Sequence, residues 1–223
     1  MDDEGLVAIG GDLSVQRLMA AYSQGIFPWY NDGFPVLWWS PNPRAILEAE
    51  NLHVSRSMRR RLRRPDYTLT WNLAFDDVLR CCGEERDGGT WIVPEMRDAY
   101  NDLHRAGFAH SVEVWQENRL VGGLYGVQCG ALFAAESMFH RVTDASKIAV
   151  IAASRTLRRA GIELFDVQFT TSHLLSLGVT EISRVQYLQR VSRLCRRRLD
   201  LSNLTVSAAP DGSGGAEGVG RLG

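Results

Sequence analysis

The sequence lacks the features that mark metal-binding, secreted and membrane-spanning proteins. Its four cysteines form no C-x-x-C pair and its five histidines are scattered, so no zinc site is expected. The acidic start, Met1 to Glu4, has neither the basic nor the apolar region of a signal peptide. The longest apolar run, Ile148 to Ala153, is far shorter than the roughly 20 residues that span a bilayer. These absences predict a soluble cytoplasmic protein with no membrane partner.

An excess of one charge is also missing. The 223 residues contain 25 Lys and Arg against 26 Asp and Glu, for a formal net charge of −1. That balance argues against a surface coated by nucleic acid, and we expect no DNA partner, but a local basic patch remains possible. The length suits one large domain, or a moderate one with a small appendage.

The first 42 residues differ from the rest of the chain in their content of tryptophan and proline. Ser14 is a good N-cap for a short helix that Gly25 would close. Three tryptophans and four prolines then fall between positions 28 and 43. Because proline interrupts the hydrogen bonding of a sheet, this stretch is predicted to be an ordered loop with aromatic anchors. We therefore expect residues 1–42 to form a small N-terminal domain.

Regular elements follow. Capping residues, glycines and apolar periodicity predict helices near 55–64, 73–82, 94–106, 145–160 and 183–198, and strands near 67–71, 111–115, 120–128, 131–138 and 162–169. Three consecutive strands, then helix, strand and helix, predict an α+β protein whose main domain, residues 43–200, is an acetyltransferase-like (GNAT-like) mixed-sheet α/β domain. Residues 201–223, rich in Gly, Ser and Ala, are expected to be a disordered tail.

Three polar residues interrupt apolar segments. Side chains alternate between the faces of a strand, so Asp166 and Gln168 are expected to share one face of strand 162–169. Burying them without partners is costly, so they either hydrogen-bond a neighbouring loop or open into a cleft. Glu136, within the apolar run 132–139, either pairs with a buried arginine or binds a cationic substrate group.

Arginines and tryptophans suggest a nucleic-acid contact. Four arginines fall at i, i+4, i+7 and i+8 of the expected helix 55–64, namely Arg56, Arg60, Arg63 and Arg64. Guanidinium groups suit phosphate oxygens, so this face either is solvated or binds an RNA backbone. Tryptophans in or beside proline-containing loops are either core anchors or a platform for an unpaired base, such as the terminal adenosine of a tRNA.

Glycines and one histidine have plainer interpretations. Gly122, Gly123 and Gly126 match neither a P-loop nor a dinucleotide fingerprint, and they predict backbone crowding or a bulge within a strand. His173 is expected to be a turn or capping residue rather than a base.

The chain resembles the leucyl/phenylalanyl-tRNA–protein transferases. The resemblance is collinear over about residues 5–190 and depends on long, idiosyncratic segments: GLVAIGGDLS (5–14), GIFPWY (25–30), VLWWSPNPRAIL (36–47), HVSRSM (53–58), GTWIVPEM (89–96), AHSVEVW (109–115), LVGGLYGV (120–127), ESMFHRVTDASK (136–147) and FDVQ through SLG (165–178). This chain departs from common family residues at Ala135, Asp144 and Thr171.

The resemblance implies a fold, a reaction and a set of site residues. The fold would be a small N-terminal domain on an acetyltransferase-like domain. The reaction would move Leu or Phe, less often Met, from aminoacyl-tRNA to proteins that begin with Arg or Lys, marking them for N-end-rule degradation. Asp166 and Gln168 would be the catalytic pair. The other matching positions would lie near the tRNA 3′ end (Trp29, Trp91), in the amino-acid pocket (Phe133), at a substrate-binding acid (Glu136) and on the tRNA backbone (Arg56, Arg60, Arg63, Arg64).

Such a reaction places modest demands on the protein. The ester on charged tRNA is already activated, so we expect no cofactor, neither ATP nor a metal. An α-amino group titrates near 8, so a useful fraction is neutral at pH 7. We expect the Gln168 amide oxygen to accept a hydrogen bond from the attacking amine, and Asp166 to orient that amide and favour the positive charge developing on the amine. Glu136 would bind the basic side chain of the acceptor.

Two alternatives stay open. An acetyl-CoA-dependent N-acetyltransferase would share the fold, but it binds pyrophosphate on a glycine-rich loop before a helix. The corresponding segment here, Arg141 to Lys147, has no glycine. A non-catalytic tRNA-binding adaptor would keep the basic face and lose the chemistry, and the intact Asp166 and Gln168 pair argues against it.

Overall fold

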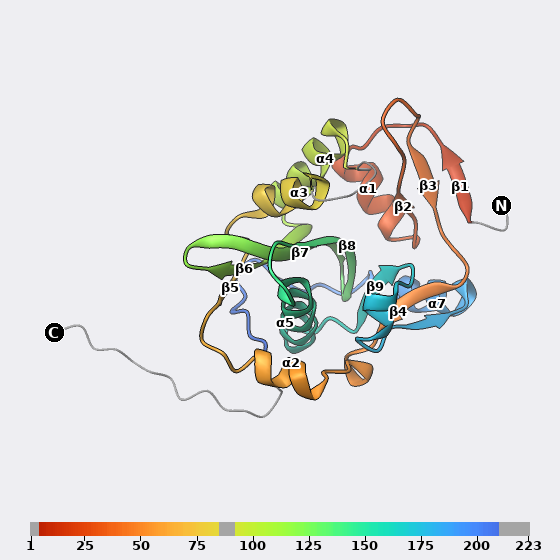
Figure 1. The fold of residues 1–223 in the computed structure, drawn as a ribbon. Coiled ribbons are helices and arrows are strands. Elements are labelled where there is room, and N and C mark those ends of the chain that lie inside the picture. The colour runs from red at the N-terminus through yellow and green to blue at the C-terminus, as the bar shows by residue number, and fades with distance from the viewer. Residues whose placement is uncertain (1–4, 85–91, 210–223) are drawn as a thin grey trace.

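A small three-stranded sheet forms the N-terminal part of the computed structural model, which describes residues 5–84 and 92–209 (Figure 1). Its strands β1 (Leu6–Ile9), β2 (Phe27–Pro28) and β3 (Leu37–Trp39) are arranged in the order β1-β3-β2. This corrects the expected irregular loop, because Phe27 and Pro28 pair with Trp39 and Trp38. Pro28 is tolerated since β2 is an edge strand, where a missing N–H costs no ladder bond.

A mixed seven-stranded sheet forms the main part, in the order β10-β4-β9-β8-β7-β6-β5 within the described residues. The strands are β4 (Arg44–Leu47), β5 (Thr68–Trp71), β6 (Ala109–Gln116), β7 (Arg119–Cys129), β8 (Leu132–His140), β9 (Leu164–Gln168) and β10 (Thr180–Ile182). Among these pairs β8 and β9 run parallel and the others antiparallel. The expected mixed-sheet α+β class is therefore confirmed, with β4 and β10 added to it.

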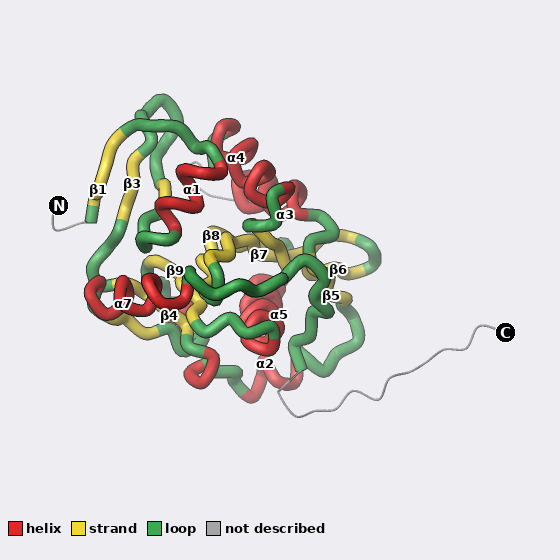
Figure 2. The backbone as a smooth tube through the Cα atoms, turned by 180° about the vertical axis from the view of Figure 1, so that it is seen from behind, coloured by secondary structure: helices red, strands yellow, loops and turns green. Residues whose placement is uncertain are grey.

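Helices cover both faces of this sheet (Figures 1 and 2). One core contains residues of α1 (Val15–Tyr22), α3 (Phe75–Glu84), α4 (Pro94–Arg105) and α7 (Arg184–Leu194). The opposite core contains residues of α2 (Arg56–Arg61), α5 (Ala145–Arg159) and α6 (Ser172–Leu175). The 3₁₀ turn η1 (Ala49–Asn51) follows β4. Because α1 shares the first core with α3, α4 and the large sheet, the N-terminal part packs directly on the main sheet.

The capping signals act as the sequence predicts. The Ser14 hydroxyl accepts the Arg17 N–H at the start of α1, and Ser183 forms a capping box with Gln186 at the start of α7. Thr171 caps α6, a short helix that the sequence did not predict and that includes His173.

The strand glycines explain how closely the layers approach. A Cβ on Gly122 would lie 2.5 Å from the Cβ of Ala145, so this glycine lets α5 pack directly on β7. A Cβ at Gly126 would meet the Ala134 carbonyl at 2.3 Å, beside the register shift between β7 and β8. The sequence predicted backbone crowding or a bulge at these glycines, and the crowding is confirmed.

The segment after α7 needs a correction. Residues 201–209, expected to belong to a disordered tail, pack on the main sheet and α5 in the structure. Leu201 is buried and its carbonyl accepts the Trp71 indole N–H at 2.7 Å. The Ser207 N–H donates to Thr156 Oγ1 at 3.1 Å, and Ala208 is also buried. The remaining residues, 210–223, lie outside the described part of the chain.

Candidate active site

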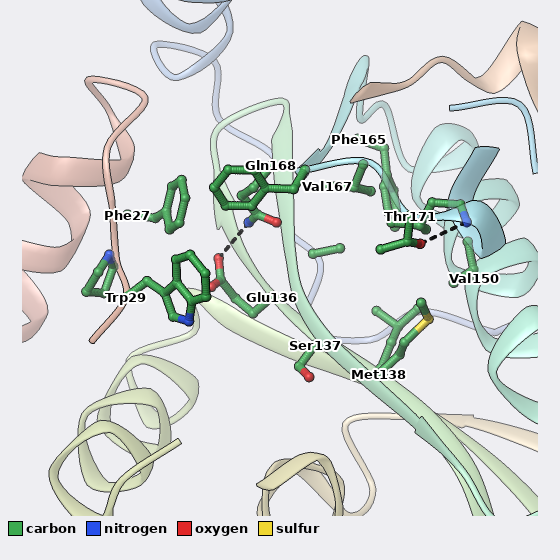
Figure 3. A pocket seen from close by; sticks show the side chains of 15 residues that line it. Phe27, Trp29, Glu136, Ser137, Met138, Val150, Phe165, Val167, Gln168 and Thr171 are labelled. Atoms are coloured by element: carbon green, nitrogen blue, oxygen red, sulfur yellow. Dashed lines mark hydrogen bonds between the residues drawn. The ribbon is translucent and has the colours of Figure 1, made fainter. Parts of the chain in front are cut away.

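A mostly apolar pocket opens where β8 and β9 separate (Figure 3). The parallel pairing of these strands stops at Ala134 and Asp166, although β8 continues to His140. The cavity between them measures about 280 Å³, near the lower end of the roughly 300–1,000 Å³ typical of small-molecule sites. Its apolar wall consists of Leu124, Met138, Val150, Phe165, Val167 and Leu174. Such a pocket suits one large apolar side chain.

Aromatic side chains form the mouth of this pocket. Trp29 and Phe169 are both partly exposed, and their rings lie 5.7 Å apart at the opening. The Trp39 indole N–H donates to the Trp29 carbonyl at 2.7 Å, which ties the loop after β2 to β3. Trp29 therefore lines the mouth of the pocket. Trp91 lies outside the described residues.

Glu136 lies between the aromatic mouth and the apolar wall (Figure 3). It is the extra residue of a bulge, since Tyr125 pairs with Ser137 but Gly126 pairs with Ala135. Its carboxylate accepts hydrogen bonds from the Tyr22 hydroxyl at 2.8 Å, the Tyr100 hydroxyl at 3.1 Å and the Gln168 side-chain amide at 3.2 Å. Tyrosines thus take the place of the buried arginine that one interpretation of Glu136 expected.

This environment changes the acidity of Glu136. Burial raises its pKa to about 7, although the hydrogen bonds from Tyr22 and Tyr100 act in the opposite direction. Burial also raises the pKa of both tyrosines well above its usual value, so they remain hydroxyl donors. Near neutral pH, Glu136 can therefore exchange a proton at little free-energy cost.

Asp166 has a different environment, on the far side of β9 from the pocket. It is fully buried. Arg44 donates hydrogen bonds to both its oxygens, with Nε 2.8 Å from Oδ1 and Nη2 2.6 Å from Oδ2. The Tyr187 hydroxyl adds a third donor at 2.7 Å. Burial alone would lower the pKa of Arg44, but the adjacent Asp166 carboxylate outweighs it and holds that pKa above its ordinary value. The pair is thus a neutralised ion pair.

Gln168 does not share the face of Asp166, which corrects the simple alternation expected for this strand. Asp166 pairs with Ile46 of β4 while Gln168 pairs with Ala45, so β9 has two residues opposite one step of β4. Gln168 adopts a left-handed φ of 59°, and its backbone N–H donates to Asp166 Oδ1 at 3.0 Å. This bulge turns the Gln168 side chain into the pocket. Asp166 consequently holds the Gln168 backbone, while Glu136 orients its side-chain amide.

Phe133 also requires a correction. It is fully buried and is not among the residues that line the pocket. Its ring instead lies 5.5 Å from that of Phe165, which does form the wall. Phe133 therefore supports the pocket from behind rather than touching its contents.

The arginine cluster is exposed, but its geometry differs from that expected. Helix α2 ends at Arg61, so only Arg56 and Arg60 lie on it, and Arg63 and Arg64 follow in a turn. The buried Met58 anchors the helix to the second core. The cluster is also partly neutralised: Arg61 and Arg64 form ion pairs with Asp66 at 2.7 and 3.2 Å.

The sequence did not identify four residues that shape the site, namely Tyr22, Arg44, Tyr100 and Tyr187. Their contacts join positions far apart in the chain: Tyr22 and Glu136 are 114 residues apart, and Arg44 and Asp166 are 122 apart. Of these four, Arg44 alone offered a sequence signal of a buried partner, because it is a single charge followed by three apolar residues.

Comparison with known proteins gives this site its context. The family described as leucyl/phenylalanyl-tRNA protein transferase matches residues 46–192, and the N-terminal domain of the same family matches residues 11–42. A leucyl/phenylalanyl-tRNA–protein transferase of Pectobacterium carotovorum is 55% identical over 192 residues, which cover 86% of this chain and 82% of that protein. The Citrobacter koseri protein of that name is 51% identical over 198 residues, covering 89% and 85%.

Solved structures are similar only at a distance. A functionally unknown Staphylococcus epidermidis protein has a TM-score of 0.45 at 10% identity, over 80% of this chain and 68% of that one. A GCN5-related N-acetyltransferase from Kribbella flavida has a TM-score of 0.41 at 10% identity, over 71% and 57%.

The sequence relatives define this protein as an aminoacyltransferase. The chain belongs to the leucyl/phenylalanyl-tRNA–protein transferase family. Within the described residues, no helix is both long and apolar enough to cross a membrane.

Proposed function

We propose that this protein transfers Leu or Phe, and less often Met, from aminoacyl-tRNA to the N-terminal Arg or Lys of acceptor proteins. The new N-terminus would mark those proteins for N-end-rule degradation in the cytoplasm, where charged tRNA is made. The observation that carries the proposal is the pocket itself. An apolar cavity sized for one large side chain meets a polar pair, Glu136 and Gln168, beside an exposed tryptophan.

Each part of the substrate has a matching surface. The amino-acid side chain enters the apolar pocket, with Phe165 and Val150 on its wall. The terminal adenosine stacks on Trp29, whose exposed ring offers a sequence-tolerant platform. The exposed arginines Arg56, Arg60, Arg63 and Arg64 contact the tRNA backbone.

The reacting groups meet at Gln168. Its Nε2 donates to Glu136, so its amide oxygen is left to accept a hydrogen bond from the acceptor amine. The amine nitrogen attacks the ester carbonyl, a peptide bond forms, and the bond to the tRNA ribose oxygen breaks. The Glu136 carboxylate, whose pKa of about 7 suits the task, takes up the proton that the amine loses and returns it to the leaving ribose oxygen.

Asp166 acts as a positioning residue in this scheme. Arg44 neutralises its charge, so Asp166 neither serves as a base nor stabilises the ammonium form of the acceptor. It fixes the strained Gln168 backbone through the N–H···Oδ1 hydrogen bond. The earlier expectation that Asp166 orients the side-chain amide is replaced by Glu136 in that role.

Transfer of radiolabelled Leu or Phe from charged tRNA tests this function. A protein beginning with Arg is compared with an otherwise identical one beginning with Ala, and acetyl-CoA is offered separately as a donor. Label on the Arg protein alone supports the proposal. Tight binding of charged tRNA without transfer would favour the adaptor, and acetylation would favour the acetyltransferase.

A further inference from the structure

The acid that recognises a basic acceptor residue is not evident at the pocket itself. Glu136 is the acid among the described lining residues, and Tyr22, Tyr100 and Gln168 already donate to it. Its pKa of about 7 leaves it partly uncharged at neutral pH. A second carboxylate that is not already engaged by three donors would be better placed to bind a cationic side chain.

We propose that Glu181 binds the Arg or Lys side chain of the acceptor's N-terminal residue. Glu181 lies on β10, the edge strand next to β4. It pairs with Ala45, and Ala45 pairs in turn with Gln168. The register therefore aligns Glu181 with the reacting amide across the sheet, two strands away.

The side chain of Glu181 projects on the pocket side of this sheet. Directly paired residues of antiparallel strands project from the same face, and Ala45 belongs to the core that contains Phe165 and Val167. The Thr170 hydroxyl donates to Glu181 Oε1 at 3.2 Å. Thr170 lies between Phe169 and Thr171, which both line the pocket. The carboxylate is thus tied to the segment whose neighbouring residues line the pocket.

The separation suits a long cationic side chain. Two strand spacings of roughly 4.8 Å place the backbones of Gln168 and Glu181 about 10 Å apart. An acceptor whose α-amino group lies at Gln168 can extend an arginine or lysine side chain along this line to meet the glutamate. Shorter acceptor side chains cannot span it.

Glu181 is also available for such a partner. It is exposed, and within residues 5–84 and 92–209 its carboxylate accepts a hydrogen bond from Thr170 and forms no ion pair. Asp166, by contrast, is buried and already paired with Arg44, so it cannot bind an acceptor side chain. The exposed Glu95 interacts electrostatically with Tyr30, which follows Trp29 in the chain, and it does not line the pocket.

The test rests on the proposed function and uses the full chain with charged tRNA. Acceptor peptides begin either with Arg or with citrulline, which has the same shape without the charge. We expect the wild type to favour Arg in kcat/KM, and Glu181→Gln to lower kcat/KM for the Arg peptide about tenfold while leaving the citrulline peptide unchanged. The loss should appear in the KM of the acceptor, with kcat and the KM of tRNA unaltered.

Two further variants sharpen the result. Glu95→Gln removes another exposed acid, outside the pocket lining, and should keep the wild-type ratio of Arg to citrulline. Glu181→Lys should reverse the preference, so that citrulline is the better acceptor. If Glu181→Gln keeps the wild-type preference for Arg, the role of Glu181 is overturned while the transfer reaction stands. If the wild type transfers to neither peptide, the proposed function and this inference fall together.

Discussion

Two carboxylates on neighbouring strands of the same sheet have opposite surroundings. Asp166 is buried against Arg44 and Tyr187, and its charge is compensated by an ion pair with short contacts. Glu136 lies among neutral donors, Tyr22, Tyr100 and Gln168, and no cation within the described residues forms an ion pair with it. The charge of Asp166 is therefore matched by a cation, whereas Glu136 can gain or lose a proton near pH 7.

This difference indicates that proton transfer takes place at Glu136, on the pocket side of β9, rather than at Asp166. A buried carboxylate paired with an arginine serves as a structural anchor. A carboxylate whose pKa is raised by burial is suited to proton transfer. Sequence proximity links Asp166 with Gln168, but geometry links the Gln168 amide with Glu136.

The largest expected effect comes from breaking the Arg44–Asp166 pair. Asp166→Asn leaves the guanidinium buried without its counter-ion, so we expect the free energy of unfolding to fall by about 3–5 kcal/mol. Urea denaturation measures this loss. The double variant Arg44→Met/Asp166→Leu removes both charges and should be more stable than Asp166→Asn. A double variant as unstable as the single one would contradict the buried-charge explanation.

Removing the Gln168 amide should affect activity rather than stability. We expect Gln168→Ala to lower kcat about 100-fold, because the hydrogen-bond acceptor of the attacking amine is lost. The free energy of unfolding should change by no more than about 1 kcal/mol, in contrast to Asp166→Asn. Single-turnover transfer and urea denaturation on the same preparation separate the two effects. Unchanged kcat would remove Gln168 from the reaction.

Narrowing the pocket should alter the choice of amino acid. Val150→Phe places a ring into the apolar wall, so transfer of Phe should fall about 10-fold more than transfer of Leu. Competition between the two charged tRNAs gives this ratio directly. The same substitution at the exposed Val185, on α7, serves as the control and should leave the ratio as it is. An equal loss for both amino acids at Val150 would place the acyl group elsewhere.

The smallest effect is expected from single substitutions in the arginine cluster, which should change the affinity for charged tRNA. Arg60→Gln and Arg63→Gln should each weaken binding of charged tRNA a few-fold, and each should reduce the slope of log affinity against log salt by about one. Filter binding across a salt series measures both quantities. Arg17→Gln, an exposed arginine paired with Asp12 in the N-terminal part, is the matched control. Salt slopes that match the wild type would show that the cluster is merely solvated.

How far sequence alone predicts this molecule depends on the range of each signal. The helix caps Ser14 and Ser183 and the strand glycines act locally, and the structure has them as predicted. Strands β4 and β10 were missed because four and three residues are too short to show a period, and pairing with distant β9 stabilises β4. The paired strands near Pro28 were missed because proline was treated as a break, whereas an edge strand accepts it.

In the candidate site, too, the sequence identified residues with a local signal but missed the partners contributed by distant elements. Glu136, Gln168 and Trp29 line the pocket, as expected for residues named from a resemblance and from polar interruptions of apolar strands. The partners that set their chemistry, such as Tyr100 and Arg44, come from distant elements. The bulge that turns Gln168 away from Asp166 depends on pairing with β4, so no periodicity within strand 162–169 could predict it.

The pKa of Glu136 also links stability to pH. Because the folded protein raises this pKa from 4.5 to about 7, it holds the proton more tightly than the unfolded chain does. The resulting stabilisation is complete below the unfolded value and is lost as pH rises through about 7. The melting temperature of the wild type should therefore fall relative to that of Glu136→Gln between pH 5 and 8.

The contrast between the two carboxylates is tested most directly by the pH dependence of the single-turnover transfer rate. For the wild type we predict a rise centred near pH 7 from Glu136, in addition to the rise near pH 8 from the acceptor amine. In Glu136→Gln the component near pH 7 should disappear and only the amine should titrate. Identical profiles for the two proteins would contradict proton transfer to Glu136 and return the chemistry to the other side of β9.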